Sequence, residues 1–556
     1  MDKKKLEINQ ILSLAVENHR INNFKLAESL YRKILKKYPN HFQSIFLLGT
    51  LLSQVKNFNE SVIMLSKAIQ IQPNHADSLH NLGSALIELG QFKKAINLLI
   101  RVTEINPSHL DVYYNLGNAF KQLKDFQKAK EYYEKEIEIQ PKNAKAYNNL
   151  GNVLKELGNL QKAINSYRQT IQIQPNHARA YHNLGNVLKQ LGDFKKAKNS
   201  YQKAFQYQPS NLETLDALSG LDKEILDPNL KNKINEILKN KNLTKKDVAY
   251  GNFLLSKYEF QQENYENEFN YLLKGHSYYF EFKKKSFEKG VDYWLKQLPK
   301  INELMNMGLS NKNIKKIDYK IKPIFIVGVP RCGSTLIEKI IASGINKIPI
   351  GEETAILSFF VGEYITEKQL FNQNMTSLRK KIIDMYKQKE LIQEKANYIF
   401  TDKSLDNFFF IGLIKEFFPL AKVINCQRNA LSSIISILKN NLGDVSWAHN
   451  LEHIFQYFDI YYQKIEDFKK IFPNYIYELQ LQKFVNNPEI ESQKLMKFCN
   501  LPWDKKCLEF YKRKDLTSRT ASNIQIRKAI YKDSEKRNLP YKQFLNKYGD
   551  KYHWFN

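Results

Sequence analysis

The chain has 556 residues, of which 43% are hydrophobic and 26% charged, and its formal net charge is +28 at pH 7. This composition excludes a disordered polar chain, and the length exceeds what one hydrophobic core usually serves, so we expect two to four domains. The positive charge suits anionic partners, but it is dispersed along a lysine-rich chain and is explained as well by composition, so we expect no nucleic-acid partner.

The cysteines and the hydropathy of the sequence indicate in which cellular compartment we expect the protein. The four cysteines, Cys332, Cys426, Cys499 and Cys507, form no CxxC pair and no regular spacing, which argues against a zinc site or a disulfide framework. No run of about 18 uncharged apolar residues occurs, and the first residues lack the apolar stretch of a secretory signal. We therefore expect no membrane span and a cytoplasmic location.

Prolines recur at a fixed interval in the first third of the chain. They stand 34 residues apart (73 − 39 = 34, and so on) at Pro39, Pro73, Pro107, Pro141, Pro175 and Pro209. A period of 34 with a terminal proline is typical of tetratricopeptide repeats, whose helix pairs bury their faces by stacking into a solenoid. We predict six repeats over residues 6–209, an all-α solenoid, and then a helical connector with a degenerate repeat over residues 210–320.

A polar column recurs within the repeats at the same period. Its members are Asn81, Asn115, Asn149 and Asn183. Further polar residues follow three positions later and share the same helix face. Carboxamides donate and accept hydrogen bonds, which suits gripping an extended peptide backbone, although a solvated consensus face would also explain the column. These four asparagines are the candidate acceptor-binding residues.

The stretch PIFIVGVPRCGSTLIEKIIASG, at residues 323–344, predicts a strand, a loop of small residues and a helix. Gly328, Gly333, Ser334 and Thr335 have the spacing of a phosphate-cradling loop, in which backbone N–H groups at a helix start face an anion. Ser334 stands where nucleotide triphosphatases carry the lysine that reaches the β- and γ-phosphates. A kinase or an ATPase is therefore disfavoured.

Apolar runs such as KVINC and YIYEL alternate with helical segments in the rest of the chain. This alternation predicts an α/β domain over residues 321–556 with a P-loop-like parallel sheet. The polar residues that follow the predicted strands would form a site at the carboxyl ends of the sheet.

These segments resemble the sulfotransferase family, which uses 3′-phosphoadenosine 5′-phosphosulfate (PAPS). VGVPRCGSTLIEKIIAS is similar to the family's 5′-phosphosulfate loop, and INCQRNALSSIISI is similar to its 3′-phosphate segment. Repeats in front of such a domain resemble bacterial tetratricopeptide-containing sulfotransferases, and GEET is similar to the tyrosylprotein sulfotransferases. The resemblance implies a sulfotransferase with PAPS as sulfonate donor and 3′-phosphoadenosine 5′-phosphate (PAP) as product, and no metal.

The resemblance also implies which residues hold the donor. The side chain of Arg331, the backbone of Cys332, Gly333, Ser334 and Thr335, and the hydroxyls of Ser334 and Thr335 would bind the 5′-phosphosulfate at the start of the helix.

Other segments would complete the donor site. Arg428 and Ser436, which stand eight residues apart, match the pair that grips the 3′-phosphate. Lys403, in the motif TDK, matches the lysine that contacts the bridging oxygen as the bond breaks. Ser522 and Arg527 resemble the family's late loop, which closes over donor and acceptor.

The catalytic base has two candidates. Similarity to GEET favours Glu353, whereas similarity to the bacterial pattern GEL and the spacing from Arg331 (352 − 331 = 21) favour Glu352. Neighbouring carboxylates point in different directions on regular elements, so we expect only one of them to deprotonate the acceptor. Ala355 stands where the tyrosylprotein enzymes carry an arginine, which weakens a tyrosine assignment.

The sequence thus predicts a PAPS-dependent sulfotransferase whose repeats recruit a hydroxyl acceptor. A peptide or protein acceptor along the concave face of the repeats ranks first, with a tyrosine as one candidate, and a carbohydrate ranks second. The alternative is an interaction scaffold with an inactive sulfotransferase-like domain. Arg331, Lys403 and Arg428 are all present, which argues against an inactive domain.

Overall fold

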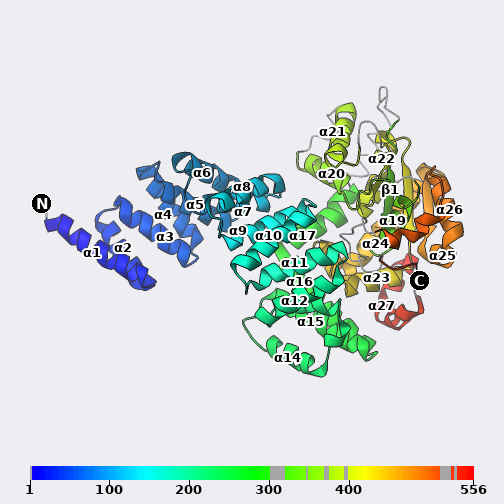
Figure 1. Ribbon diagram of the computed structural model, residues 1–556, viewed down its shortest axis with the longest axis horizontal. Helices are drawn as coiled ribbons and strands as arrows, with labels where there is room; N and C mark the ends of the chain where they lie inside the picture. Colours follow the sequence, from blue (N-terminus) through cyan, green and yellow to red (C-terminus); the bar gives the residue numbers. More distant parts are fainter. Residues whose placement is uncertain are drawn as a thin grey trace. The chain divides into compact units, whose positions relative to one another are not determined.

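The computed structural model describes residues 3–300, 320–345, 348–367, 375–392, 398–513, 527–530 and 535–555 (Figure 1). The chain folds into two compact units. The first is Met1–Leu188 with Gln202–Tyr207, and the second is Lys189–Tyr201 with Gln208–Asn556.

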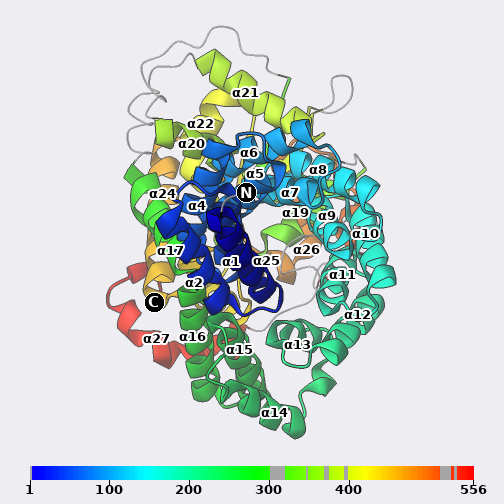
Figure 2. The ribbon, with the colours of Figure 1, turned by 90° about the vertical axis from the view of Figure 1, so that its left-hand side faces the viewer.

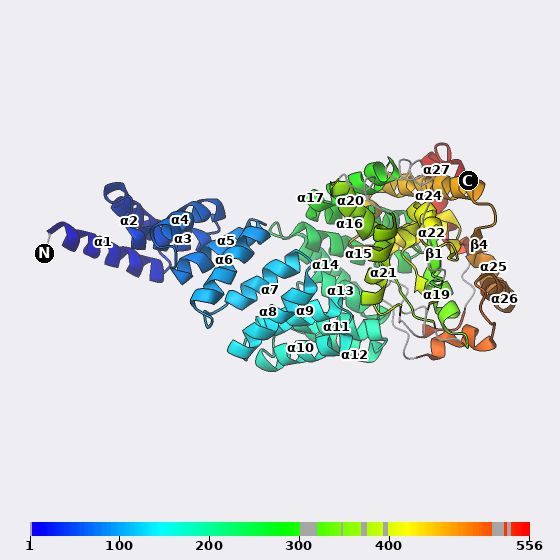
Figure 3. The same cartoon turned by 90° about the horizontal axis from the view of Figure 1, so that it is seen from above.

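The N-terminal part is a tetratricopeptide solenoid, as the period of 34 predicts. Its helices pair in chain order, and successive pairs follow one another along the array (Figure 3). The helices are α1 (Lys3–Arg20), α2 (Phe24–Lys37), α3 (Phe42–Gln54), α4 (Phe58–Ile71), α5 (Ala76–Glu88), α6 (Phe92–Ile105), α7 (Val112–Gln122), α8 (Phe126–Ile139), α9 (Ala144–Glu156), α10 (Leu160–Ile173), α11 (Ala178–Leu191) and α12 (Phe194–Tyr207).

A glycine in the first helix of four pairs, those that begin with α3, α5, α7 and α9, lets the second helix approach closely. A Cβ on Gly117 would lie 2.7 Å from the ring of Tyr133, and one on Gly151 would lie 2.6 Å from the ring of Tyr167. Both tyrosines are fully buried. The glycine and its large partner recur with the sequence period, so the same packing is built in successive repeats.

Helices after the repeats lead into the C-terminal domain and share its hydrophobic core. Phe253 and Phe269 belong to the same buried cluster as Ile326 and Ile341. The two long helices of this segment, α15 and α16, lie side by side (Figure 2). The elements are α13 (Leu212–Ser219), the 3₁₀ helix η1 (Lys223–Ile225), α14 (Pro228–Leu238), α15 (Lys245–Gln261), α16 (Tyr265–Phe282), α17 (Lys284–Asp292) and the π-helix η2 (Tyr293–Gln297).

The C-terminal domain is built on a four-stranded parallel sheet, which confirms the predicted α/β fold. The strand order is β2-β1-β3-β4. The strands are β1 (Ile324–Gly328), β2 (Thr401–Asp402), β3 (Lys422–Gln427) and β4 (Ile476–Gln480). All five residues of β1 are buried, because this strand lies between two neighbours and is covered by helices.

Helices connect the four strands, and further helices come after β4 in the chain. They are α19 (Ser334–Ala342), α20 (Ile356–Glu367), α21 (Met375–Gln388), η4 (Leu405–Phe410), α22 (Ile411–Phe417), α23 (Ala430–Lys439), η5 (Ser446–His449), α24 (Leu451–Ile471), α25 (Leu481–Asn486), α26 (Pro488–Phe498), η6 (Lys505–Lys512), η8 (Glu535–Tyr541), α27 (Lys542–Gly549) and η9 (His553–Phe555). Among the described residues, no helix combines the length and the apolar character needed to span a bilayer.

Candidate active site

The loop between β1 and α19 has the backbone of an anion-binding turn. Arg331 has φ 72° and Gly333, the N-cap of α19, has φ 96°, so both lie in the left-handed region. Because the N-cap residue is a glycine, it has no side chain with which to cap the helix. The start of α19, with Ser334 and Thr335 as its first residues, carries partial positive charge from its N–H groups.

Glycine is required where β1 ends. A Cβ on Gly328 would lie 2.7 Å from the carbonyl oxygen of Cys426 and 2.8 Å from Sγ of Cys332. The two thiols are hydrogen-bonded to each other, which lowers the pKa of Cys332 and raises the pKa of Cys426. Both cysteines are fully buried, so they pack the loop against β3.

The structure brings together the residues that the sequence predicts for the two ends of the donor. Arg428, directly after β3, donates from Nη1 to the carbonyl oxygen of Arg331 at 3.3 Å. Arg331 donates from Nε to Oγ of Ser436 at 2.9 Å, and Ser436 lies on α23. Two arginines and a hydroxyl thus gather at the carboxyl ends of two adjacent strands, a set of donors suited to phosphate groups.

Lys403, which follows β2, forms an ion pair with one of the two candidate bases. Its side chain is 1% exposed, and Nζ lies 2.9 Å from Oε1 of Glu353, whose side chain is 54% exposed. Burial lowers the pKa of Lys403, but Glu353 and the buried Glu338 more than offset this, and the net pKa is raised. Lys403 is therefore held as an ammonium beside a solvent-accessible carboxylate.

Glu352 faces a different network. Its Oε1 lies 3.3 Å from Nζ of Lys339, and its side chain is 17% exposed. The backbone N–H of Glu352 donates to Oε1 of Glu338 at 3.0 Å, and its carbonyl accepts from the N–H of Lys403 at 2.7 Å. Glu352 has φ 51°, so this turn directs two adjacent carboxylates to two different lysines.

Glu338 and Asp402 are functional candidates that the sequence reasoning missed. Burial raises the pKa of Glu338, which accepts a hydrogen bond from Thr401 Oγ1 at 2.9 Å. Asp402 accepts from Thr354 Oγ1 and from Tyr386 OH, both at 2.6 Å. These two carboxylates fix the segments that carry the two glutamates and Lys403, so we regard them as positioning residues.

A signal for Glu338 was present in the sequence. The charged dipeptide Glu338–Lys339 interrupts the apolar positions of α19, and both residues are at most 1% exposed. Buried charges that are paired occur mainly where a site or a network needs them.

The late loop is only partly described. Ser522 lies outside the described residues. Arg527 donates to the carbonyl oxygens of Leu191 and Arg513, both at 3.4 Å, and its guanidinium covers Gly192. The contacts with Leu191 and Gly192 lie at the turn between α11 and α12, and Arg513 is the residue that follows η6. A donor-binding role for Arg527 stays a prediction.

The asparagine column is engaged in bonds between repeats. Asn149 donates from Nδ2 to Oδ1 of Asn118 at 3.1 Å and to Tyr114 OH at 3.2 Å. Asn183 donates to Oδ1 of Asn148 and of Asn152, at 3.1 and 3.0 Å. The other two behave alike: Asn115 donates to Ser84 Oγ at 2.9 Å, and Asn81 donates to Thr50 Oγ1 at 3.1 Å.

One member of the column, Asn115, lines a cavity of the solenoid. This cavity, of about 840 Å³, is lined by His80, Asp111, Tyr114, Asn115 and residues of the turn that precedes α9. Because the amide hydrogens of Asn149 and Asn183 are already used, any contact of these two side chains with an acceptor falls to their Oδ1 atoms.

No group of three or more His, Cys, Asp or Glu side chains able to hold a metal ion is found in the described parts of the chain.

A parallel α/β domain with a glycine-containing loop between its first strand and the following helix, preceded in the chain by stacked helical repeats, defines the class of this protein. Residues 323–505 match the sulfotransferase family, and residues 42–75, 78–142 and 142–210 match tetratricopeptide repeats. Residues 323–505 are therefore a sulfotransferase-family domain, and tetratricopeptide repeats precede it in the chain.

Known proteins match parts of the chain. An uncharacterized protein of Aquifex aeolicus (strain VF5) is 32% identical over 238 residues, which are 40% of this chain and 31% of that protein, so the chain spans less than a third of its length. The crystal structure of MamA is 26% identical, with a TM-score of 0.28, and covers 30% of this chain and 96% of its own. That of YrrB, a TPR protein with an unusual peptide-binding site, is 21% identical, with a TM-score of 0.30, and covers 34% and 96%.

Proposed function

We propose that this protein transfers a sulfonate group from PAPS to a hydroxyl group of a polypeptide acceptor. The observation that carries the proposal is the convergence of Arg428, Arg331 and Ser436 after β3 and β1, through contacts of 3.3 and 2.9 Å. Two arginines joined in this way, beside the positively polarised start of α19, form one anion-binding surface that spans two strand ends. Such a surface suits a nucleotide with phosphates at two positions.

The donor residues fit PAPS by their chemistry. Ser334 and Thr335 supply N–H groups and hydroxyls for one anionic end, and Arg428 with Ser436 supplies charge and a hydroxyl for the other. PAPS would supply an activated sulfonate with PAP as its leaving group. Lys403, held protonated by its glutamate neighbours, would place positive charge beside the oxygen that leaves.

Glu353 is the base that the geometry favours. Its carboxylate is about half exposed and reaches Lys403, so an acceptor hydroxyl can approach it from solvent and pass its proton to Oε1 or Oε2. Glu352 is more buried and faces Lys339, which is not among the residues assigned to the donor site. We assign Glu352 to positioning, because its backbone also holds Lys403.

The repeats would recruit the acceptor. The cavity beside Asn115 joins an amide, an imidazole, a carboxylate and a phenol, which can hydrogen-bond to a peptide backbone. We therefore rank a polypeptide above a carbohydrate as acceptor, and we propose that Asn81, Asn115, Asn149 and Asn183 border its path.

The donor half is tested by calorimetry with PAP and the full chain. We expect saturable binding that Arg428→Ala weakens by tenfold or more, since a charge-assisted contact contributes about 1.5–3 kcal/mol. Arg168→Ala, at an exposed position of α10, is the matched control and should bind PAP as the wild type does. Absence of PAP binding would reject the transferase and favour a scaffold whose domain is inactive.

The acceptor half is tested with sulfur-labelled PAPS and a cell lysate. Label that is removed by protease and resists glycosidases would support a polypeptide acceptor. Label that glycosidases release would identify a carbohydrate instead and would overturn the ranking.

A further inference from the structure

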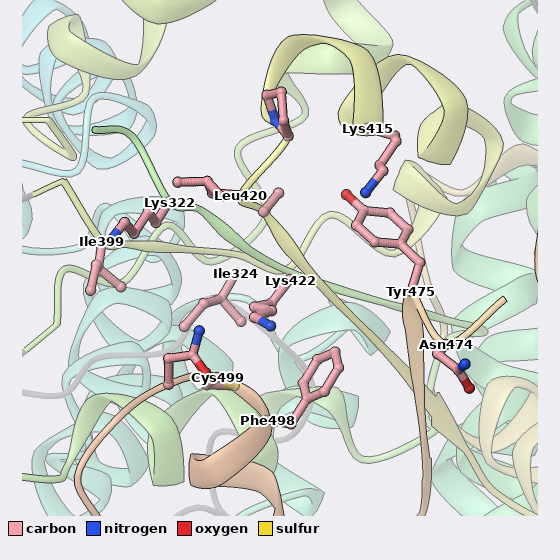
Figure 4. A pocket seen from close by; sticks show the side chains of 13 residues that line it. Lys322, Ile324, Ile399, Lys415, Leu420, Lys422, Asn474, Tyr475, Phe498 and Cys499 are labelled. Atoms are coloured by element: carbon pink, nitrogen blue, oxygen red, sulfur yellow. The ribbon is translucent and has the colours of Figure 1, made fainter. Parts of the chain in front are cut away.

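A second cavity lies at the opposite ends of the strands from the donor loop. It has a volume of about 280 Å³ and is bordered by the first residues of β1 and β3 and by the residue before β4 (Figure 4). The lining residues that matter here are Lys322, Lys415, Lys422, Tyr475 and Phe498. Five residues of β1 separate this end from the donor loop, about 13 Å along the strand.

The charged side chains that line the cavity are all positive. Lys322, Lys415 and Lys422 line it, and no Asp or Glu does so. Within the described residues, none of these three lysines forms an ion pair. Nζ of Lys415 lies 4.2 Å from the ring centre of Tyr475, and Nζ of Lys422 lies 4.8 Å from that of Phe498. The two rings hold two ammonium groups at the cavity by cation–π contacts, which leave the N–H donors available to a ligand.

A buried hydroxyl adds a second, independent indication. The OH group of Tyr475 is shielded from solvent and has no hydrogen-bond partner among the described residues. It points toward the side of the cavity where the amine of Lys415 lies (Figure 4). A buried polar group without a partner costs free energy, and a bound anion accepting from this hydroxyl would remove the cost.

We propose that this cavity is a binding site for a compact phosphate- or sulfate-type oxyanion carrying at least two negative charges. Three ammonium groups and a phenol supply only donors and positive charge, which match the oxygens of such an anion and disfavour a cation or a neutral ligand. The volume admits inorganic phosphate, pyrophosphate or the phosphate end of a nucleotide. The site is separate from the donor loop, since it shares no lining residue with it.

The test is calorimetry of the full chain with pyrophosphate, phosphate and adenosine 5′-monophosphate in turn. All three arms use the Arg428→Ala background, so that binding at the donor loop is weakened equally for each ligand. We expect saturable binding of pyrophosphate, and a loss of tenfold or more in Lys415→Gln/Lys422→Gln. Tighter binding of the nucleotide than of phosphate would identify a nucleotide as the source of the anion; equal or weaker binding would identify a free inorganic anion.

Two further variants keep the proposal falsifiable should the double variant fold poorly. Lys322 is exposed, so Lys322→Gln should fold normally and weaken pyrophosphate severalfold, and Tyr475→Phe should weaken it while keeping the ring. Lys497→Gln is the matched control, because Lys497 is exposed on α26 and does not line the cavity. The proposal is overturned if pyrophosphate does not bind, if the cavity variants bind it as tightly as the control does, or if chloride at equal ionic strength competes fully.

Discussion

The bond between neighbouring repeats at Asn149 allows a quantitative test of the solenoid. Replacing Asn149 by alanine removes two hydrogen bonds, at 3.1 Å to Asn118 and at 3.2 Å to Tyr114. Each bond is worth about 1 kcal/mol net, and alanine returns about 0.5 kcal/mol of helix propensity. The variant should therefore lose about 1.5 kcal/mol of stability. Asn118 keeps one partner, Tyr133 OH at 2.7 Å, so no buried acceptor is left unpaired.

The loss should be local to the array. Amide hydrogen exchange of the full chain, followed by mass spectrometry, reports the opening free energy of α7 to α9 separately from the rest. The control is Asn97→Ala, at an exposed position of α6 that has no hydrogen bond in the described residues; it should change stability by less than about 0.5 kcal/mol.

A double-mutant cycle isolates the bond itself. Asn149→Ala combined with Asn118→Ala should show a coupling of about 1 kcal/mol, because the two side chains share one hydrogen bond. If Asn149→Ala behaved like Asn97→Ala, and the coupling were near zero, the column would be a solvated face, and the reasoning from inter-repeat bonds would be wrong.

Three further predictions concern the C-terminal domain. Glu353→Gln should abolish sulfonate transfer and change the affinity for PAP by less than about threefold. Glu352→Gln should retain measurable transfer in the same labelled-PAPS assay. The reverse result would identify Glu352 as the base. Lys403→Met should lower the turnover of labelled PAPS by 100-fold or more, while Lys380→Met, at an exposed position of α21, should leave it unchanged. Burial raises the pKa of Asp406 from 3.8 to about 6, so the folded protein binds this proton more tightly than the unfolded chain, and the carboxyl costs stability as pH rises from 4 to 6. Urea unfolding should show Asp406→Asn gaining up to about 2 kcal/mol over the wild type between pH 4.5 and 7.5, and a difference independent of pH would exclude this titration.

Features that are local or periodic in the sequence could be predicted. The period of 34 predicts the repeats because each helix pair packs against equivalent neighbours. The turn after β1 could be predicted from Gly328 and Gly333, since a Cβ at either position would clash with neighbouring atoms. Lys403 and Arg428 could be placed at strand ends because parallel strands leave their following residues at one edge.

Contacts between distant segments could not be predicted in this way. Periodicity shows that Asn149 shares a face with its equivalents, but not that its donors reach the preceding repeat, 31 and 35 residues back. The choice between Glu352 and Glu353 depends on a positive φ at Glu352 and on which lysine each carboxylate meets, and neither is written in the local sequence. The shared core of the connector and the sheet likewise depends on side chains more than 50 residues apart.

The strand order explains why the candidate site gathers at this place in the sheet. The chain leaves β1 for β2 on one side and returns to β3 on the other side, so β1 lies at the point where the direction of strand addition reverses. At such a point the segments that follow adjacent strands diverge and leave a crevice. Arg331 follows β1, Lys403 follows β2 and Arg428 follows β3, so three positive residues stand at the same edge of the sheet, where we propose that the sulfonate donor binds. The amino ends of β1, β3 and β4 lie at the other edge of the sheet. The lysines of the second cavity are there, so they are separated by the length of the strands from the positive residues of the candidate active site.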